Sequence, residues 1–120
     1  MAGELILIVE DNENNRMLVR DVLQSRGYQT AETDTGEEGV RLAREHRPAL
    51  ILMDIQLPGM NGMDALRLLR AEAATRDIPV MAVTASAMTQ DRQKIMATGF
   101  DAYQSKPINV REAVWLAPQS

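Results

Sequence analysis

The sequence has no cysteine, a single histidine and few aromatic residues, which make up 3% of the chain. The absence of cysteine excludes a disulfide framework, thiol chemistry and cysteine-ligated zinc. His46 cannot supply a zinc site by itself, and its place beside Arg47 at a predicted helix end is typical of a surface residue. The scarcity of aromatic rings also argues against binding nucleic acid by base stacking.

Long apolar runs and dense basic segments are missing as well. The apolar runs are shorter than the roughly 20 residues that span a bilayer, and the run Leu5–Val9 lacks the basic flank of a signal peptide. The net charge of -4 does not favour direct nucleic-acid binding, because neutralising phosphates supplies most of that affinity. We therefore expect a cytoplasmic protein that contacts neither a membrane nor nucleic acid directly.

The residues that are present indicate one folded unit. Of the 120 residues, 45% are hydrophobic, which suffices for one core but not for two ordinary domains, so we expect a single domain over residues 1–120. Five short runs predict β-strands, and three of them are almost continuously apolar, as strands buried on both faces are. The five are Leu5–Val9, Tyr28–Glu32, Ala49–Met53, Pro79–Val83 and Phe100–Ser105.

Apolar residues at helical spacing occupy the segments between these runs. Gly27 and Gly99 follow two of the segments, where a helix often ends in a left-handed residue. Alternating strands and helices predict an α/β fold, with a five-stranded parallel sheet of order 2-1-3-4-5 and helices on both faces, doubly wound as in flavodoxin. The predicted helices are Asn14–Arg26, Glu37–His46, Met63–Glu72, Met88–Ala97 and a short last one near Val110–Leu116.

Reactive polar residues follow four of the five predicted strands. In such sheets the ligand lies beyond the carboxyl ends of the strands, at the point where the strand order reverses, here between the first and third strands. Glu10 and Asp11 follow the first strand, and Asp54 follows the third. Thr84 and Lys106 follow the fourth and fifth strands. These five residues are therefore the candidate site.

Three carboxylates at one edge need a cation, because each close pair repels by about 4 kcal/mol in a partly buried setting. An all-oxygen ligand set favours Mg2+, and we predict Asp11 and Asp54 as direct ligands and Glu10 as a ligand through water. With that charge neutralised, Asp54 can attack an activated phosphoryl group, while Lys106 and Thr84 bind its oxygens. The predicted product is an aspartyl phosphate.

The same positions carry four motifs that strongly resemble those of CheY-like response regulator receiver domains. The resemblance extends over nearly the whole chain, and it is closest to the receivers of hybrid kinases and to stand-alone bacterial cell-cycle regulators. The four motifs are Ile8–Asn12, Leu52–Gly62, Val83–Ala85 and Ser105–Pro107.

The resemblance implies a two-component phosphorelay switch. A histidine kinase or histidine phosphotransfer protein would donate the phosphoryl group from phosphohistidine, and downstream proteins would bind the altered shape. The backbone carbonyl of Gln56 would complete the metal shell, and Lys106–Pro107 would be a cis peptide. Thr84 and Tyr103 would move together as the switch, although Tyr103 could also be a packing aromatic. The protein would catalyse its own phosphorylation and dephosphorylation but no other reaction.

Partner docking is expected on the first predicted helix, around Asn15, Met17 and Leu18, because the family presents that helix beside the phosphorylation site. Pro118 shortens the last predicted helix, so we expect a monomer or weak dimer rather than a dimer built on that helix. The chain starts shortly before its first strand and shows no effector domain, which favours a stand-alone regulator. A receiver taken from a hybrid kinase or a longer regulator is the alternative.

Other interpretations apply to the residues taken singly and to the protein. Glu10 and Asp11 could cap the first helix, Asp54 could cap a loop, and Thr84 could be an ordinary strand residue, but their joint placement favours a site.

A flavodoxin-type electron carrier would not place acids where its cofactor phosphate binds. A Mg2+-dependent phosphatase with an aspartate nucleophile usually carries a second acid where this chain has Gln56. A degenerate receiver that only binds partners is the last alternative.

Overall fold

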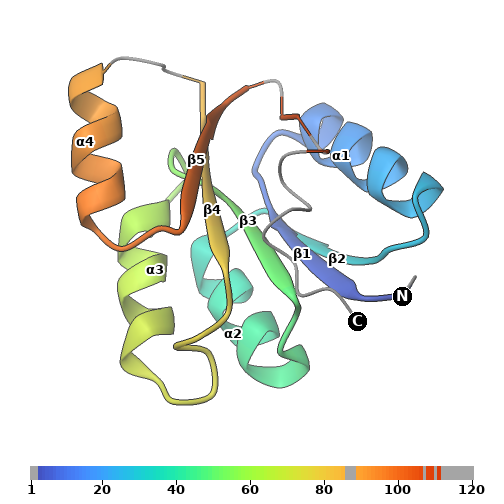
Figure 1. The fold of residues 1–120 in the computed structure, drawn as a ribbon, viewed down its shortest axis with the longest axis horizontal. Coiled ribbons are helices and arrows are strands. Elements are labelled where there is room, and N and C mark those ends of the chain that lie inside the picture. Colours follow the sequence, from blue (N-terminus) through green and yellow to red (C-terminus); the bar gives the residue numbers. More distant parts are fainter. Residues whose placement is uncertain (1–2, 86–88, 107, 110, 112–120) are drawn as a thin grey trace.

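Strands and helices alternate along the part of the chain that the computed structural model describes, residues 3–85, 89–106, 108–109 and 111 (Figure 1). The alternation is the predicted one. The strands are β1 (Leu5–Val9), β2 (Gln29–Thr33), β3 (Leu50–Asp54), β4 (Val80–Thr84) and β5 (Ala102–Ser105). The helices are α1 (Glu13–Ser25), α2 (Gly36–His46), α3 (Gly62–Ala71) and α4 (Thr89–Ala97).

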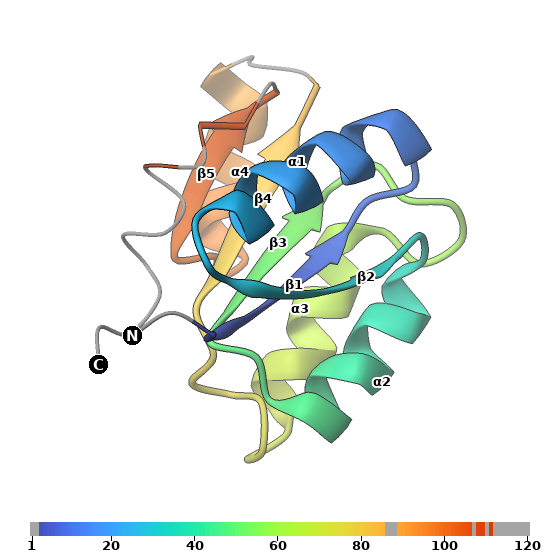
Figure 2. The same cartoon turned by 90° about the vertical axis from the view of Figure 1, so that its right-hand side faces the viewer.

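The strands form one parallel sheet in the order β2-β1-β3-β4-β5, which confirms the predicted topology. β1 pairs with β2 on one side and with β3 on the other, so the strand order reverses between β1 and β3. The loops that follow these two strands lead to opposite faces of the sheet, since α1 and α3 cover different faces (Figure 2). This divergence opens the edge at which the sequence places the candidate site.

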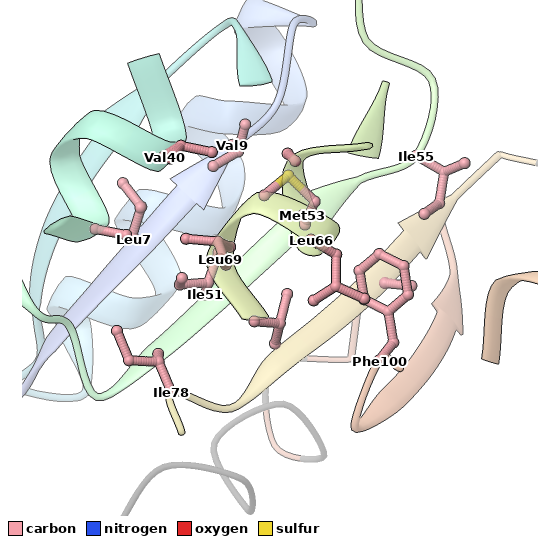
Figure 3. Close-up of a cluster of buried hydrophobic side chains, with 14 of the residues drawn as sticks. Leu7, Val9, Val40, Ile51, Met53, Ile55, Leu66, Leu69, Ile78 and Phe100 are labelled. Atoms are coloured by element: carbon pink, nitrogen blue, oxygen red, sulfur yellow. The ribbon is translucent and has the colours of Figure 1, made fainter. Parts of the chain in front are cut away.

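Two hydrophobic clusters lie on the two faces of the sheet. Side chains alternate along each strand, so Leu7 and Val9 of β1 join the larger cluster and Ile6 and Ile8 join the smaller one. Figure 3 shows the larger cluster, in which Val40 of α2 packs beside Val9. The smaller cluster packs under α1. The strands are therefore buried on both faces, as their continuous apolar sequences predict.

The ends of β3 and β4 lie one residue later than predicted, and backbone pairing explains the difference. Asp54 is aligned with Val83 of the neighbouring strand, and Thr84 is aligned with Ser105. Both polar residues are therefore the last residues of their strands rather than the first residues of the following loops. Their backbones are held by the sheet, which makes their side chains more rigidly placed than loop residues would be.

The prediction that the fifth strand begins at Phe100 is wrong, because β5 begins at Ala102. Phe100 packs into the larger cluster without being part of the strand. Asp101 accepts the N–H of Val80 on its carboxylate at 2.8 Å and also accepts a hydrogen bond from Arg70 at 2.7 Å. These side-chain bonds, which periodicity cannot predict, hold the segment before β5.

Asparagine and threonine side chains cap the N-termini of three of the helices. Asn12, Thr35 and Asn61 accept hydrogen bonds from backbone N–H groups in the first turns of α1, α2 and α3. These caps explain why the three helices begin one residue earlier than predicted. Gly27 and Gly99 have positive φ values of 92° and 118° after α1 and α4, as predicted.

Four predictions lie outside the described residues. Three are the cis peptide at Pro107, the end of the last helix before Pro118, and the helix near Val110–Leu116, of which the structure describes Arg111. Helix α4 is described from Thr89, so the predicted start at Met88 is also outside. Within the described part of the chain, every helix is too short or too polar to cross a membrane.

Candidate functional site

Two buried carboxylates and one ammonium meet at the carboxyl edge of the sheet. Asp54 ends β3 with 2% of its surface exposed, and Glu10, which directly follows β1, is 5% exposed. Lys106 follows β5, and its Nζ atom lies 2.7 Å from Glu10 Oε1 and 3.0 Å from Asp54 Oδ2. The structure thus brings together three of the five predicted residues from three different strands.

Backbone groups hold the remaining oxygens of this cluster. Asp54 Oδ1 accepts the N–H of Gln56 at 3.0 Å, and Glu10 Oε2 accepts the N–H of Asn12 at 3.0 Å. The N–H of Lys106 donates to the carbonyl of Thr84 at 2.8 Å, which ties the lysine backbone to the end of β4. In each carboxylate, therefore, one oxygen accepts a hydrogen bond from a backbone N–H two residues later, and the other contacts the ammonium of Lys106.

The charges at this cluster do not balance, because one ammonium faces two carboxylates. Burial, reinforced by the neighbouring Glu10 carboxyl, raises the pKa of Asp54 to about 7. Burial also raises the pKa of Glu10, but hydrogen bonds from Asp54, Lys106 and Asn12 outweigh it and lower the pKa overall. Burial lowers the pKa of Lys106, yet its bonds to Glu10 and Asp54 raise it overall. In the metal-free protein Asp54 is therefore the group that takes up a proton.

The raised pKa of Asp54 makes the metal-free fold less stable as the pH rises. Between the ordinary value of 3.8 and about 7, the folded state binds this proton more tightly than the unfolded state, so the free energy of unfolding falls. Asp54→Asn removes the contribution, and we expect the variant to be more stable than the wild type by about 2 kcal/mol at pH 8 but not at pH 4. Urea unfolding with a chelator measures both proteins, and parallel pH profiles would contradict the assignment.

A third carboxylate, that of Asp11, completes a set of possible metal ligands. One oxygen each from Glu10, Asp11 and Asp54 lie within 4.8 Å of one another. Asp11 is exposed whereas the other two are buried, so the cluster opens to solvent on one side only. An all-oxygen set with uncompensated negative charge fits a hard divalent cation such as Mg2+. Gln56 is exposed, and the binding of the metal by its backbone carbonyl stays a prediction.

The two predicted switch residues occupy neighbouring strands. Thr84 is 3% exposed at the end of β4, and Tyr103 of β5 is aligned with Ala82, one pleat before Thr84. Parallel partners point to the same face, so both side chains belong to the face that carries the larger cluster. Tyr103 is half-buried against that cluster, with the guanidinium of Arg92 at 5.6 Å from its ring centre. A coupled movement of the pair stays a prediction.

A groove runs from the acidic cluster along α1. It has a volume of about 110 Å3, and its walls include Glu10, Lys106, Asn15 and Leu18. Leu18 is exposed over 65% of its surface. Two of the three predicted docking residues therefore line this groove. The third, Met17, is 40% exposed on the same helix but does not line it.

Two residues that support the site were missed by the sequence patterns. Arg16 of α1 donates to the backbone carbonyl of Glu10 at 2.8 Å and so holds the loop that carries the acids. Gly62, the first residue of α3, leaves room for the backbone of β3, because an added Cβ would lie 2.4 Å from the carbonyl oxygen of Asp54. Neither spacing nor periodicity in the sequence indicates this close approach.

The chain is similar to known proteins over most of its length. The family model of the response regulator receiver domain matches residues 6–115. The polar-differentiation response regulator DivK of Brucella anthropi is 51% identical over 105 residues, which are 88% of this chain and 85% of that protein.

Solved structures give the same relationship. The receiver domain of a sensor histidine kinase from Pseudomonas aeruginosa, solved with a magnesium ion coordinated in its active site cleft, is 38% identical with a TM-score of 0.84, over 92% of this chain and 91% of that one. The Vibrio cholerae chemotaxis protein CheY4 shares the fold with a TM-score of 0.88 at 23% identity, over 98% of this chain and 100% of that one.

Proposed function

Because this chain belongs to the family of response regulator receiver domains, which act in two-component signalling, we propose that it accepts a phosphoryl group on the carboxylate of Asp54. The observation that carries the proposal is the setting of this carboxylate. Asp54 is 2% exposed, one of its oxygens is held by the Gln56 N–H, and the other lies 3.0 Å from Lys106. A buried, oriented carboxylate beside a cation is suited to attack phosphorus.

Glu10, Asp11 and Asp54 would hold Mg2+, with the backbone carbonyl of Gln56 as a further ligand. When bound, the ion would neutralise the carboxylates and draw charge from the phosphoryl oxygens. The excess negative charge of the cluster and the raised pKa of Asp54 support this assignment, because both would be relieved by a divalent cation. The related kinase receiver solved with magnesium in its cleft supports it as well.

The residues of the chain supply the remaining steps. A carboxylate oxygen of Asp54 forms a bond to phosphorus while the bond from phosphorus to the imidazole nitrogen of a phosphohistidine donor breaks, and the leaving imidazole takes a proton from solvent. The ammonium of Lys106 binds one phosphoryl oxygen, and the hydroxyl of Thr84 binds another. The movement of Thr84 and Tyr103 toward the phosphoryl group then changes the surface that downstream proteins bind. The burial of Asp54 limits access of the water that would hydrolyse the product.

Intact-mass spectrometry tests this function. Wild-type protein incubated with Mg2+ and an acyl phosphate or beryllofluoride is expected to gain one adduct, which a chelator prevents. Asp54→Asn, which keeps the shape of the side chain, is expected to gain none. If the wild type forms no adduct with either reagent, the chain is a degenerate receiver that binds partners without being phosphorylated.

The groove along α1, lined by Asn15 and Leu18, and the exposed Met17 of the same helix are the proposed docking site of the phosphohistidine donor. The groove starts at the acidic cluster, and its apolar wall includes Leu18 and Val22, which are exposed residues of α1. We expect Leu18→Arg to slow phosphoryl transfer from a histidine phosphotransfer protein by about tenfold or more, because a charge replaces a central apolar contact. The rate is measured with whichever donor of a panel phosphorylates the wild type.

The matched control for this prediction is Leu68→Arg. Leu68 is 43% exposed on α3, on the opposite face of the sheet from α1. This substitution adds the same charge without touching the groove, so transfer should keep its wild-type rate. Equal effects of the two substitutions would contradict docking on α1.

A further inference from the structure

One buried side chain holds the loop that follows β5. Gln104 is 8% exposed, and its amide makes two hydrogen bonds to the backbone of Asn109. Gln104 Nε2 donates to the Asn109 carbonyl at 3.0 Å, and Gln104 Oε1 accepts the Asn109 N–H at 2.6 Å. Losing the glutamine amide would remove both of these hydrogen bonds. We call this pair of bonds the Gln104 clamp.

The clamp lies shortly after Lys106 in the chain, and we use the name clamped loop for the described residues Lys106, Ile108 and Asn109. The N–H of Lys106 donates to the Thr84 carbonyl at 2.8 Å, so the loop is fixed at its beginning by β4. The clamp at Asn109 fixes its end. From the first of these anchors, the lysine side chain must reach Glu10 and Asp54, which it contacts at 2.7 and 3.0 Å. Lysine has a long flexible stem, so the position of its backbone limits where its ammonium can be held.

The clamped loop also carries a wall of the site. Ile108 is partly buried against the smaller hydrophobic cluster. It lines the groove along α1 together with Leu18, and it lines a cavity of about 10 Å3 together with Asp54. A loop that is free to shift would therefore move the lysine and this wall together.

We propose that Gln104 is a positioning residue for Lys106, acting through the backbone of Asn109. The role assigned to Lys106 in binding a phosphoryl oxygen rests on the proposed function. The placement of the ammonium between Glu10 and Asp54 does not, because the two distances of its Nζ atom to their carboxylates show it directly. The placement of the Lys106 ammonium and its role in binding a phosphoryl oxygen can therefore be tested separately.

The first experiment follows the lysine directly. The chain has two lysines, Lys94 and Lys106, so lysine labelled with carbon-13 gives two sets of side-chain NMR signals. Lys94 is exposed on α4 and serves as an internal reference. In metal-free Gln104→Leu, we expect the Lys106 side-chain signals to move toward those of Lys94, which should not change. Unchanged Lys106 signals would overturn the proposal.

A control variant separates this effect from general loss of stability. Thr75 is buried at the opposite edge of the sheet, where its hydroxyl donates to the Leu69 carbonyl at 2.6 Å. Thr75→Val removes one buried hydrogen bond and should leave the Lys106 signals in place. If Gln104→Leu does not fold, Gln104→Glu replaces it, because a carboxylate keeps the acceptor for Asn109 N–H but loses the donor.

The second experiment measures the consequence for phosphoryl binding. We expect Gln104→Leu to weaken binding of beryllofluoride in the presence of Mg2+ by about tenfold, as the loss of one charge-assisted hydrogen bond does. Affinity for Mg2+ alone should stay within about twofold, because the acidic ligands lie outside the clamped loop. Equal beryllofluoride affinities in wild type and variant would contradict the positioning role. Failure of the wild type to bind beryllofluoride would instead count against the proposed function, and the NMR comparison would still decide the role of the clamp.

Discussion

Lys106→Met, measured without magnesium, is expected to lose about 3 kcal/mol of unfolding free energy at pH 8. Methionine keeps most of the aliphatic stem but removes the ammonium that lies 2.7 Å from Glu10 and 3.0 Å from Asp54. The two buried carboxylates then face each other without this cation, and removing one partner of a buried ion pair is strongly destabilising. Urea unfolding in the presence of a chelator measures the loss.

The loss should shrink as the pH falls. Burial and the Glu10 carboxyl raise the pKa of Asp54 to about 7, so below that pH a proton compensates part of the charge that Lys106 compensates in the wild type. The pKa of Lys106 is raised above 10.5, so the stabilising ammonium is fully present throughout this range and is lost only at strongly alkaline pH. At pH 6 we therefore expect about half of the loss seen at pH 8.

Lys94→Met is the matched control for this substitution. Lys94 is the second lysine of the chain and is exposed on α4. Its replacement should change stability by less than about 0.5 kcal/mol at both pH values, as surface substitutions usually do. A loss in Lys106→Met that is the same at pH 6 and pH 8 would show that the lost packing, rather than the lost charge, is responsible.

Gly62→Ala is expected to damage the site without removing any of its functional groups. The added Cβ would lie 2.4 Å from the Asp54 carbonyl oxygen and 3.0 Å from Ile55 Cα, and both are backbone atoms that cannot rotate away. The end of β3 must therefore shift, and it carries Asp54. We expect a loss of about 2 to 3 kcal/mol in unfolding free energy, since overpacking costs this much, although alanine favours the helix. Calorimetry should also show weaker binding of Mg2+.

Gly59→Ala, in the loop between β3 and α3, is the control for this substitution. Gly59 has a φ of +71°, so alanine is strained there, but the nearest atom to its added Cβ is a Glu37 carboxylate oxygen at 3.5 Å. We expect a loss of about 1 kcal/mol from the backbone strain and Mg2+ affinity close to that of the wild type. If both variants bind Mg2+ as the wild type does, the close approach of Gly62 to β3 does not determine the position of Asp54.

The sequence predicted the fold well because the signals for a parallel sheet are local and strong. Buried strands such as β3 and β4 are continuously apolar, and helical spacing lies between them. The first and last residues of the helices and strands were predicted less well, because they depend on particular hydrogen bonds. Asn12 caps α1 through its side chain, and Asp101 rather than a strand pair holds the segment before β5. Periodicity carries no information on such bonds.

The members of the candidate site could be predicted for a related reason. In a parallel sheet, all strand ends lie at one edge, so a polar residue after an apolar run is assigned to that edge by sequence alone. This reasoning selected Glu10, Asp54 and Lys106. In the structure, the ammonium of Lys106 lies within hydrogen-bond distance of both carboxylates. The same reasoning could not assign Tyr103, because the alignment of β5 with β4 sets its distance from Thr84.

The sequence by itself determined which segments form the strands, in which order the sheet is built and which polar groups reach its carboxyl edge. Those features follow from periodicity and chain connectivity, which act over short stretches. Only the tertiary structure decided the charge state of Asp54, the close approach of Gly62 to β3, and the clamp between Gln104 and Asn109. Each of these depends on burial or on atoms brought together by packing, and neither burial depth nor a contact distance is encoded in a local pattern.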